Sequence, residues 1–237
     1  DPRRKKTDHI SEKRKKDRRK RMQGKLYGVG VGPGDPELLT LKAMRLIKEA
    51  PVIAVPAEEP KKSVAYQIVI QAYPQLEEKE LLAVSMPMTK NKEKLEESHN
   101  AGARRIKDVL DEGKDVVFLT LGDPTVYSTY LYIHKRICAM GYETEIVSGI
   151  ASFCAVSARL NQGLVEKAQP LHVIPASYQI EEALKLPGTK VLMKAGKKMK
   201  QVKEQMKILG EEGMMIENCG MENEKIYRSV EEIPDDA

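Results

Sequence analysis

The chain has 237 residues, of which 41% are hydrophobic and 32% are charged, a composition typical of a globular protein and not of a disordered or fibrous one. Its longest apolar runs, such as residues 51–57, are far shorter than the roughly 20 residues of a membrane-spanning helix, so we expect no membrane partner. The length suffices for one large domain or for two small ones, each with its own core.

Charge is distributed unevenly along the chain. The formal net charge is +5. Residues 1–21 hold 12 of the 40 Lys and Arg residues but only 4 of the 35 acidic ones, which leaves 28 basic against 31 acidic residues, a net charge of −3, in residues 22–237. Clustered cations can bind phosphates, but this segment has no aromatic side chain for base stacking. We interpret residues 1–21 as a disordered or vector-derived leader, with a functional basic tail as the alternative, and expect no nucleic-acid partner.

The cysteines and histidines lack the spacing of a metal site. The cysteines, Cys138, Cys154 and Cys219, are scattered along the chain, and so are three of the four histidines, His99, His134 and His172. No C-x-x-C pair occurs, which predicts reduced thiols, a cytoplasmic location and no protein-bound metal. We interpret each histidine as a surface residue or a hydrogen-bonded core residue.

From Gly24 to Leu160, segments typical of strands alternate with segments typical of helices. Thr40 is a suitable N-cap for the helix that follows it, Pro74 stops the next helix, and Gly113 ends a long charged one. The predicted strands are 25–31, 51–57, 79–88 and 115–121, the predicted helices are 41–50, 63–75, 90–113 and 130–141, and a strand, a glycine turn and a helix follow within 144–160. This alternation predicts an α/β fold with a mostly parallel sheet.

The pattern changes after about Gly163. Shorter strand-like segments follow at 169–177, 189–196, 212–220 and 225–233, with one helix at 197–210. We therefore predict an N-terminal α/β domain at residues 22–164 and a smaller C-terminal α/β domain at residues 165–237.

Glycine follows three of the predicted strands, as Gly32 and Gly34, as Gly122 and as Gly149. Parallel sheets bind ligands at the carboxyl ends of their strands, and glycine lets the bare backbone approach a ligand closely. The three glycine turns together predict a binding site at this edge of the sheet.

The first of these loops, from Gly28 to Pro36, is not a dinucleotide-binding loop. In G-x-G-x-x-G the third glycine lies at the start of a helix that faces the pyrophosphate, whereas this position is Pro33 counted from Gly28 and Asp35 counted from Gly30. The prolines also hinder a helix from starting there. Taken alone, the loop could simply be a tight turn between a strand and a helix.

Three ordered motifs give a more specific signal: "GVGPGDPELLTLKA", "LTLGDPTVYST" and "IVSGIASFCAVSARL". In this order and spacing they resemble the S-adenosylmethionine-dependent tetrapyrrole (corrin/porphyrin) methylases. The resemblance covers about residues 22–233. The segment from Val84 to Tyr130 is most similar to precorrin-2 C20-methyltransferases, including those that act on cobalt-factor II.

The resemblance implies two α/β domains with a ligand cleft between them, usually in a homodimer. It also implies methyl transfer from S-adenosylmethionine to C20 of precorrin-2 or cobalt-factor II in cobalamin biosynthesis, with S-adenosylhomocysteine as the product. Pro33 would wall the tetrapyrrole side of the cleft and lie near the cofactor. The other cofactor contacts that the resemblance implies are Leu121, Gly122, Asp123, Val126, Ala151, Ser152, Lys194 and Cys219.

Several of these residues have a simpler alternative interpretation. Asp123 precedes a proline and could make a turn, Ser152 could be the N-cap of a helix, and Lys194 could be a solvated lysine at a strand end. Tyr127 lies in the same loop as Asp123, where a tyrosine often packs in the core. No residue pattern identifies a catalytic acid or base.

Precorrin-2 carries many carboxylates, so cations are expected to face it. The candidates are Lys90, Lys92, Arg104, Arg105 and Arg159, each of which could equally be an ordinary solvated charge. Members of the family usually continue into a final strand, whereas this sequence stops at Ala237, so we expect that the C-terminal domain lacks its last strand or that the sequence ends before the natural one.

Two other functions stay open at this point. The first is a related methyltransferase that acts on another tetrapyrrole, on RNA or on protein. The second is a non-catalytic α/β binding module, in which the glycine turns are only turns and which binds no S-adenosylmethionine.

Overall fold

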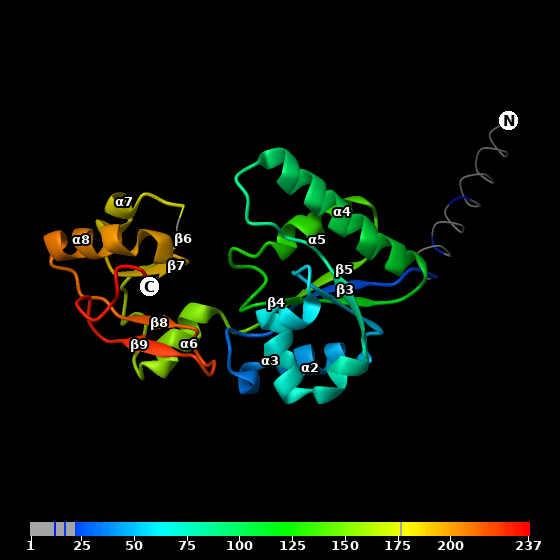
Figure 1. The fold of residues 1–237 in the computed structure, drawn as a ribbon, viewed down its shortest axis with the longest axis horizontal. Helices are drawn as coiled ribbons and strands as arrows, with labels where there is room; N and C mark the ends of the chain where they lie inside the picture. Colours follow the sequence, from blue (N-terminus) through cyan, green and yellow to red (C-terminus); the bar gives the residue numbers. More distant parts are fainter. Residues whose placement is uncertain (1–11, 13–16, 18–21, 176) are drawn as a thin grey trace. The chain divides into compact units, whose positions relative to one another are not determined.

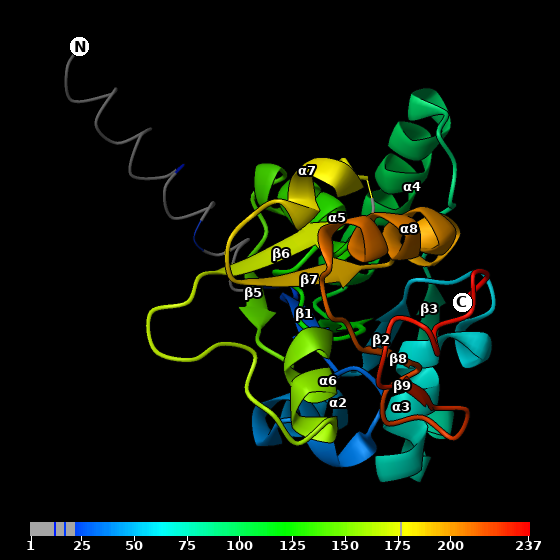
Figure 2. The same cartoon turned by 90° about the vertical axis from the view of Figure 1, so that its left-hand side faces the viewer.

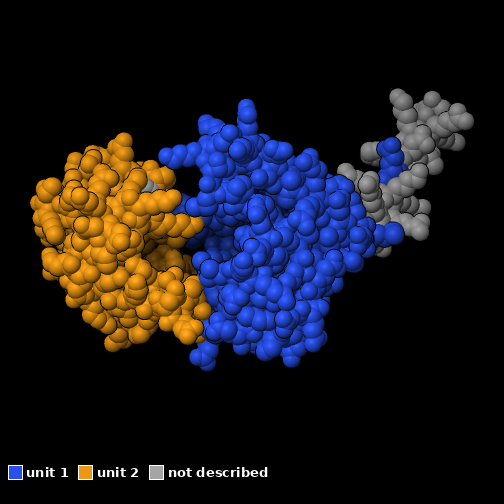
Figure 3. Space-filling model, viewed as in Figure 1, with its two compact units in different colours: residues 1–32, 36–149 blue, residues 33–35, 150–237 orange. Residues whose placement is uncertain are grey.

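A computed structural model describes residues 12, 17, 22–175 and 177–237, so most of the predicted leader lies outside the described residues. Contacts divide the chain into two compact units (Figure 3): unit 1 comprises residues 1–32 and 36–149, and unit 2 comprises residues 33–35 and 150–237. The sequence analysis placed a boundary at residue 165, so the two divisions differ for residues 150–164 and 33–35. The predicted domain boundaries stay a prediction.

Unit 1 contains a parallel sheet, which confirms the predicted fold class. The strand order is β3-β2-β4-β1-β5, and every neighbouring pair is parallel. The strands are β1 (Leu26–Gly30), β2 (Val52–Val55), β3 (Glu80–Ala83), β4 (Val116–Thr120) and β5 (Thr144–Val147). In the register of the two central strands, Gly30 lies opposite Thr120.

Helices cover both faces of this sheet (Figures 1 and 2). One face carries α2 (Leu41–Glu49) and α3 (Val64–Ala72), and the other carries α4 (Lys92–Asp111) and α5 (Tyr130–Ala139). Short 3-10 turns occur at η1 (Pro36–Leu38), η2 (Pro60–Lys62) and η3 (Pro74–Glu78). No helix in the described part of the chain is long and apolar enough to cross a membrane.

Local sequence signals set the ends of these helices. The Thr40 hydroxyl accepts a hydrogen bond from the Ala43 N–H at 3.0 Å, which confirms the predicted N-cap of α2. Asn91 caps α4 by accepting from the N–H groups of Glu93 and Lys94. Helix α3 ends before Pro74, as predicted, because proline has no N–H with which to continue the helix.

A hydrophobic core lies between the sheet and the helices α4 and α5. It is built mostly from aliphatic side chains on alternate strand positions and on one face of each helix: Leu26, Val52, Ala54, Val84, Ala103, Ile106, Val109, Leu110, Val116, Phe118, Tyr130, Ile133, Ile137 and Tyr142. The Tyr130 ring packs directly over Gly28 of β1, where an added Cβ would lie within 3.0 Å of the ring. Gly28 therefore serves packing.

Unit 2 has a smaller set of elements. It contains a parallel pair, β6 (Leu171–Pro175) and β7 (Thr189–Met193), and an antiparallel pair, β8 (Met215–Glu217) and β9 (Lys225–Tyr227). Its helices are α6 (Ser152–Arg159), α7 (Ile180–Leu184) and α8 (Met199–Leu209), and a 3-10 turn, η4 (Gly196–Lys198), precedes α8.

Helix α7 was missed in the sequence analysis, which placed a single helix among these strands. Its five residues are too few for a helical period to be recognised. Tertiary packing stabilises α7, because Ile180 and Leu184 join a buried cluster with Met199, Val202 and Ile233.

Candidate functional site

The strand order of unit 1 creates a switch point between β1 and β4. After β1 the chain passes through α2 to β2, which lies towards one edge of the sheet. After β4 it passes through α5 to β5, which lies at the other edge. Open parallel sheets bind ligands outside the carboxyl ends of strands at such a point, because the diverging connections leave a crevice there. In this sheet those ends are Gly30 and Thr120.

Backbone from three loops converges at the switch point. Gly32 and Gly122 form an isolated antiparallel bridge, in which the Gly122 N–H donates to the Gly32 carbonyl at 2.8 Å. A Cβ added to Gly30 would lie 2.6 Å from the Gly122 oxygen and 2.7 Å from the Gly149 nitrogen, closer than real Cβ atoms approach. Only glycine therefore fits at Gly30, and the loops after β1, β4 and β5 meet there.

Asp123 links two of these loops. Its Oδ1 accepts from the Thr125 N–H at 2.7 Å and from the Thr125 hydroxyl, and its Oδ2 accepts from the Gly149 N–H at 3.0 Å. Burial raises the pKa of Asp123, but the hydrogen bonds from Thr125 and Gly149 outweigh it, and the pKa is lowered. The turn that the sequence analysis weighed as the alternative is present, and the cofactor contact stays a prediction.

A buried polar group without a partner lies beside this link. Thr120, the last residue of β4, is 7% exposed, and its hydroxyl has no hydrogen-bond partner among the described residues. Leaving a buried hydroxyl unpaired costs about 1–3 kcal/mol, so such groups are exceptions that call for a ligand or a water. The sequence analysis missed Thr120.

The loop from Leu121 to Thr129 presents exposed side chains around this point. Leu121 is 47% exposed and Tyr127 is 48% exposed, so Tyr127 does not pack in the core, contrary to one interpretation of the sequence. Tyr127 also has a positive φ of 48°, which is uncommon for a residue with a side chain. Val126 is half-buried in the same loop.

Two of the predicted residues of unit 2 lie close together. Pro33 is buried, and a Cβ added to its neighbour Gly34 would lie within 3.0 Å of the Cys219 carbonyl. Cys219 is also buried, and burial raises the pKa of its thiol. The segment after β1 and the loop after β8 are therefore packed backbone against backbone within this unit.

The other predicted residues of unit 2 lie at element ends. Ala151 is the N-cap residue of α6 and makes no side-chain cap, and Ser152 is the first helical residue, so the proposed capping role of Ser152 is wrong. The N-cap residue of α6 therefore gives no side-chain hydrogen bond to the first amides of the helix. Lys194 follows β7, is exposed, and has a positive φ of 57°.

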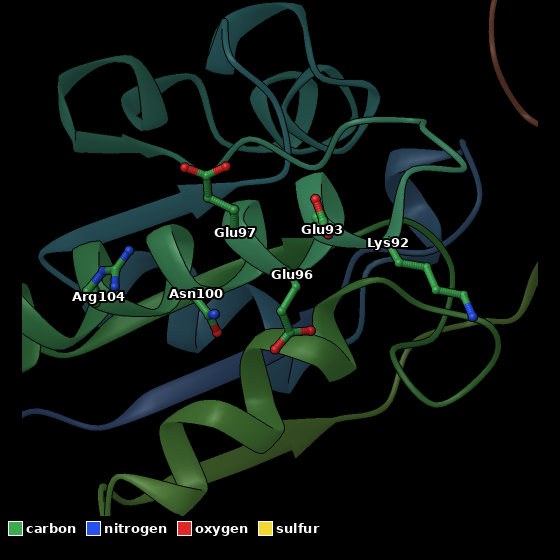
Figure 4. Close-up of a pocket in the computed structure, with 6 residues that line it drawn as sticks. All are labelled: Lys92, Glu93, Glu96, Glu97, Asn100 and Arg104. Carbon is green, nitrogen blue, oxygen red and sulfur yellow. The ribbon is translucent and has the colours of Figure 1, made fainter.

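The candidate cations for substrate carboxylates are all exposed. Arg159 pairs with Glu224 at 2.9 Å, and Arg105 donates to the Ala83 carbonyl. Lys92 and Arg104 line a hollow along α4 (Figure 4). The complete lining is Lys92, Glu93, Glu96, Glu97, Asn100 and Arg104. Its three carboxylates outnumber its two cations, so this hollow does not suit a polycarboxylate.

The three histidines in the described part of the chain have partners, which confirms their interpretation as core or surface residues. His99 is buried and stacks on Tyr132 with ring centroids 4.6 Å apart. The Nδ1 of His134 lies 3.1 Å from the Tyr130 hydroxyl, and the Nε2 of His172 lies 3.0 Å from the Pro187 carbonyl. Burial lowers the pKa of both His99 and His134.

Comparison with known proteins gives one consistent family. Residues 25–234 match the family described as Tetrapyrrole (Corrin/Porphyrin) Methylases. The chain is 41% identical over 172 residues, 72% of each chain, to a Methanocaldococcus jannaschii protein named "Probable cobalt-precorrin-2 C(20)-methyltransferase". It is 29% identical to a Sinorhizobium sp. protein named "Precorrin-2 C(20)-methyltransferase", over 90% of this chain and 91% of that one.

A solved structure supports the same assignment. The uroporphyrin-III C-methyltransferase of Thermus thermophilus, complexed with S-adenosyl homocysteine, is similar with a TM-score of 0.66 and 25% identity. The similarity covers 88% of this chain and 90% of that one.

Proposed function

The chain belongs to the tetrapyrrole (corrin/porphyrin) methylases, and from this premise we propose that it transfers a methyl group from S-adenosylmethionine to C20 of precorrin-2 or of its cobalt complex in cobalamin biosynthesis. The names of the relatives support this reaction and its place. The solved relative that holds S-adenosyl homocysteine supports the cofactor.

The observation that carries the proposal is the edge where β1 and β4 end. Bare backbone from Gly30, Gly122 and Gly149 meets there, and the buried Thr120 hydroxyl beside it has no partner among the described residues. A nucleoside with a polar amino-acid tail can approach the ends of β1 and β4 closely there, because these glycines place no side chain between it and the backbone. The residues present therefore suit S-adenosylmethionine.

When bound, S-adenosylmethionine supplies a methyl carbon activated by a sulfonium, whose sulfur leaves as a neutral thioether. The task of this chain is orientation, because rate is gained by holding the reacting atoms in line at near-contact distance. Leu121, Gly122 and Val126 would hold the cofactor through backbone groups and apolar contact, and Thr120 would add one hydrogen bond. No covalent nucleophile and no metal ion is needed for this displacement, so we expect no protein-bound metal.

We also propose cofactor and substrate contacts for residues of unit 2. Ala151 and Ser152 would offer the amides at the start of α6, since such amides point outward and attract polar or anionic groups. Lys194 and Cys219 would contribute through the loops after β7 and β8, and Pro33 would wall the tetrapyrrole side. The α4 hollow is not among these contacts.

The cobalt complex is the substrate that we favour. The 41% identical relative is named for cobalt-precorrin-2, whereas the relative whose name gives precorrin-2 without cobalt is 29% identical. The cobalt ion would be part of the substrate and needs no ligand from this chain.

The test is a methylation assay without oxygen, in which the full chain is incubated with S-adenosylmethionine and either precorrin-2 or cobalt-factor II. We expect the tetrapyrrole to gain the mass of one CH2 unit, because the methyl group replaces a proton of the macrocycle, and to gain it faster with the cobalt complex. No gain with either substrate, in a sample that binds S-adenosylhomocysteine, would redirect the proposal to another acceptor such as RNA or protein. A folded sample without cofactor binding would favour a non-catalytic module.

We also infer a homodimer that works in the cytoplasm. The resemblance to the family, whose members are usually homodimers, supports this inference. Light scattering on the purified chain tests this directly, and a monomer at micromolar concentration would contradict the dimer.

A further inference from the structure

Asp123 is the one predicted cofactor residue whose side chain is already engaged on both oxygens. Oδ1 accepts two hydrogen bonds from Thr125, and Oδ2 accepts one from the Gly149 N–H. Hydrogen bonds to a charged acceptor are about twice as strong as neutral ones. The carboxylate therefore holds the loop after β4 closed on itself and ties it to the loop after β5.

The tie acts on the backbone that faces the switch point. Gly149 is packed so closely that an added Cβ would lie within 3.0 Å of both the Gly122 oxygen and the Gly30 Cα. Gly122 is in turn fixed to Gly32 through their mutual hydrogen bonds of 2.8 and 3.3 Å. Displacing Gly149 would therefore shift the backbone of all three loops.

We propose that Asp123 is a positioning residue, which fixes the Gly122 and Gly149 backbone for cofactor binding and does not itself contact the cofactor. The inference rests on the proposed function, since it concerns the site where S-adenosylmethionine is expected. It assigns to Asp123 a different role from the direct contact that the family resemblance implies.

The first experiment compares two substitutions in the full chain. Asp123→Asn replaces one carboxylate oxygen with an NH2 group. If this NH2 group faces the Gly149 N–H, two donors meet. If it faces Thr125 instead, the hydrogen bonds that form the Thr125 turn are lost. Thr125→Val is the matched control, because it removes one hydrogen bond to Asp123 but keeps the link to Gly149. We expect Asp123→Asn to raise the Kd of S-adenosylhomocysteine about 10-fold, the scale of a lost hydrogen bond to a charged group, and Thr125→Val to raise it less than about threefold.

Kinetics separate positioning from a general loss of structure. Asp123→Asn should raise the KM of S-adenosylmethionine about 10-fold while the KM of the tetrapyrrole stays constant. If Asp123→Asn does not fold, Asp123→Ser replaces it, since serine can accept from the Thr125 N–H in a turn but has no second oxygen for Gly149. Equal increases in both KM values would overturn the positioning role.

Two probes distinguish positioning from direct contact. One is an S-adenosylhomocysteine analogue without the two ribose hydroxyls, and the other is 5′-methylthioadenosine, which lacks the amino-acid part. Positioning predicts the same Asp123→Asn penalty for both probes as for S-adenosylhomocysteine. A penalty that disappears with either probe would overturn the inference, because it would confine the effect of Asp123 to the one missing group and not to the backbone of all three loops. An unchanged Kd in Asp123→Asn also overturns the inference, whereas a wild-type chain that binds none of these ligands contradicts the proposed function itself.

Discussion

The two ends of the unit 1 sheet are built from different chemistry. Near the amino ends of β1 and β5, Glu145 pairs with Lys25 at 2.7 Å and with Lys42 at 2.5 Å, and the Lys25 N–H donates to Asp115 at 2.7 Å. At the carboxyl ends lie glycine backbone, the engaged Asp123 carboxylate and the Thr120 hydroxyl, which has no partner in the described part of the chain. At the amino ends charged side chains pair with one another, whereas at the carboxyl ends polar groups are available to a ligand.

This difference indicates which end serves stability and which serves binding. Substitutions at the carboxyl end should alter cofactor affinity more than stability, and substitutions at the amino end should do the reverse. The three predictions below test this contrast, beginning with the largest expected effect.

Gly149→Ala should affect the binding end most. The added Cβ would meet the Gly122 oxygen and the Gly30 Cα, and overpacking of this kind costs about 1–3 kcal/mol. Because the shift is confined to the proposed site, we expect the Kd of S-adenosylhomocysteine to rise about 10- to 100-fold, which calorimetry can measure.

The control for that change is Gly163→Ala. The nearest atom to a Cβ at Gly163 is 3.6 Å away, an ordinary contact, so this variant should bind S-adenosylhomocysteine like the wild type. Similar affinities of the two variants for S-adenosylhomocysteine would show that crowding at Gly149 does not affect cofactor binding.

Thr120→Val should separate affinity from stability. The two side chains have similar shape, and valine removes the unpaired buried hydroxyl, so the ligand-free chain should gain about 1 kcal/mol of unfolding free energy. The proposed hydrogen bond to the cofactor is lost as well, and affinity should fall about 3- to 10-fold. Urea unfolding and calorimetry report the two effects, and a destabilised variant with unchanged affinity would mean that the hydroxyl has a partner other than the cofactor.

Glu145→Gln should produce the smallest effect, and only on stability. Hydrogen bonds from Lys25 and Lys42 lower the pKa of Glu145 to about 2. A carboxyl whose pKa is lower in the folded chain adds stability above its unfolded pKa and loses it as pH falls towards the folded value. Since these pairs are partly solvated, the loss at pH 7 should be no more than about 1 kcal/mol.

The pH dependence gives a check on that assignment. The stability difference between wild type and Glu145→Gln should shrink as pH falls from about 4.5 to about 2, as followed by urea unfolding. Binding of S-adenosylhomocysteine at pH 7 should not change. A constant difference across this pH range would show that the ion pairs contribute nothing.

Several features of the site could be predicted from local sequence. Glycine after three of the strand ends, the Thr40 cap and the Pro74 stop are signals that act over a few residues, and the structure has them. The three ordered motifs sufficed to identify the family, because they combine these turns with a fixed spacing.

The sequence by itself thus determined an α/β fold with a parallel sheet and a glycine-rich edge, since alternation of apolar segments and turn residues is a local property of the chain. Only the tertiary structure decided that β4 lies between β2 and β1, and hence that Thr120 stands opposite Gly30. It also decided that the Asp123 carboxylate reaches Gly149, 26 positions along the chain. Such pairings depend on how distant segments pack against a common core, and no periodicity within one segment records that choice.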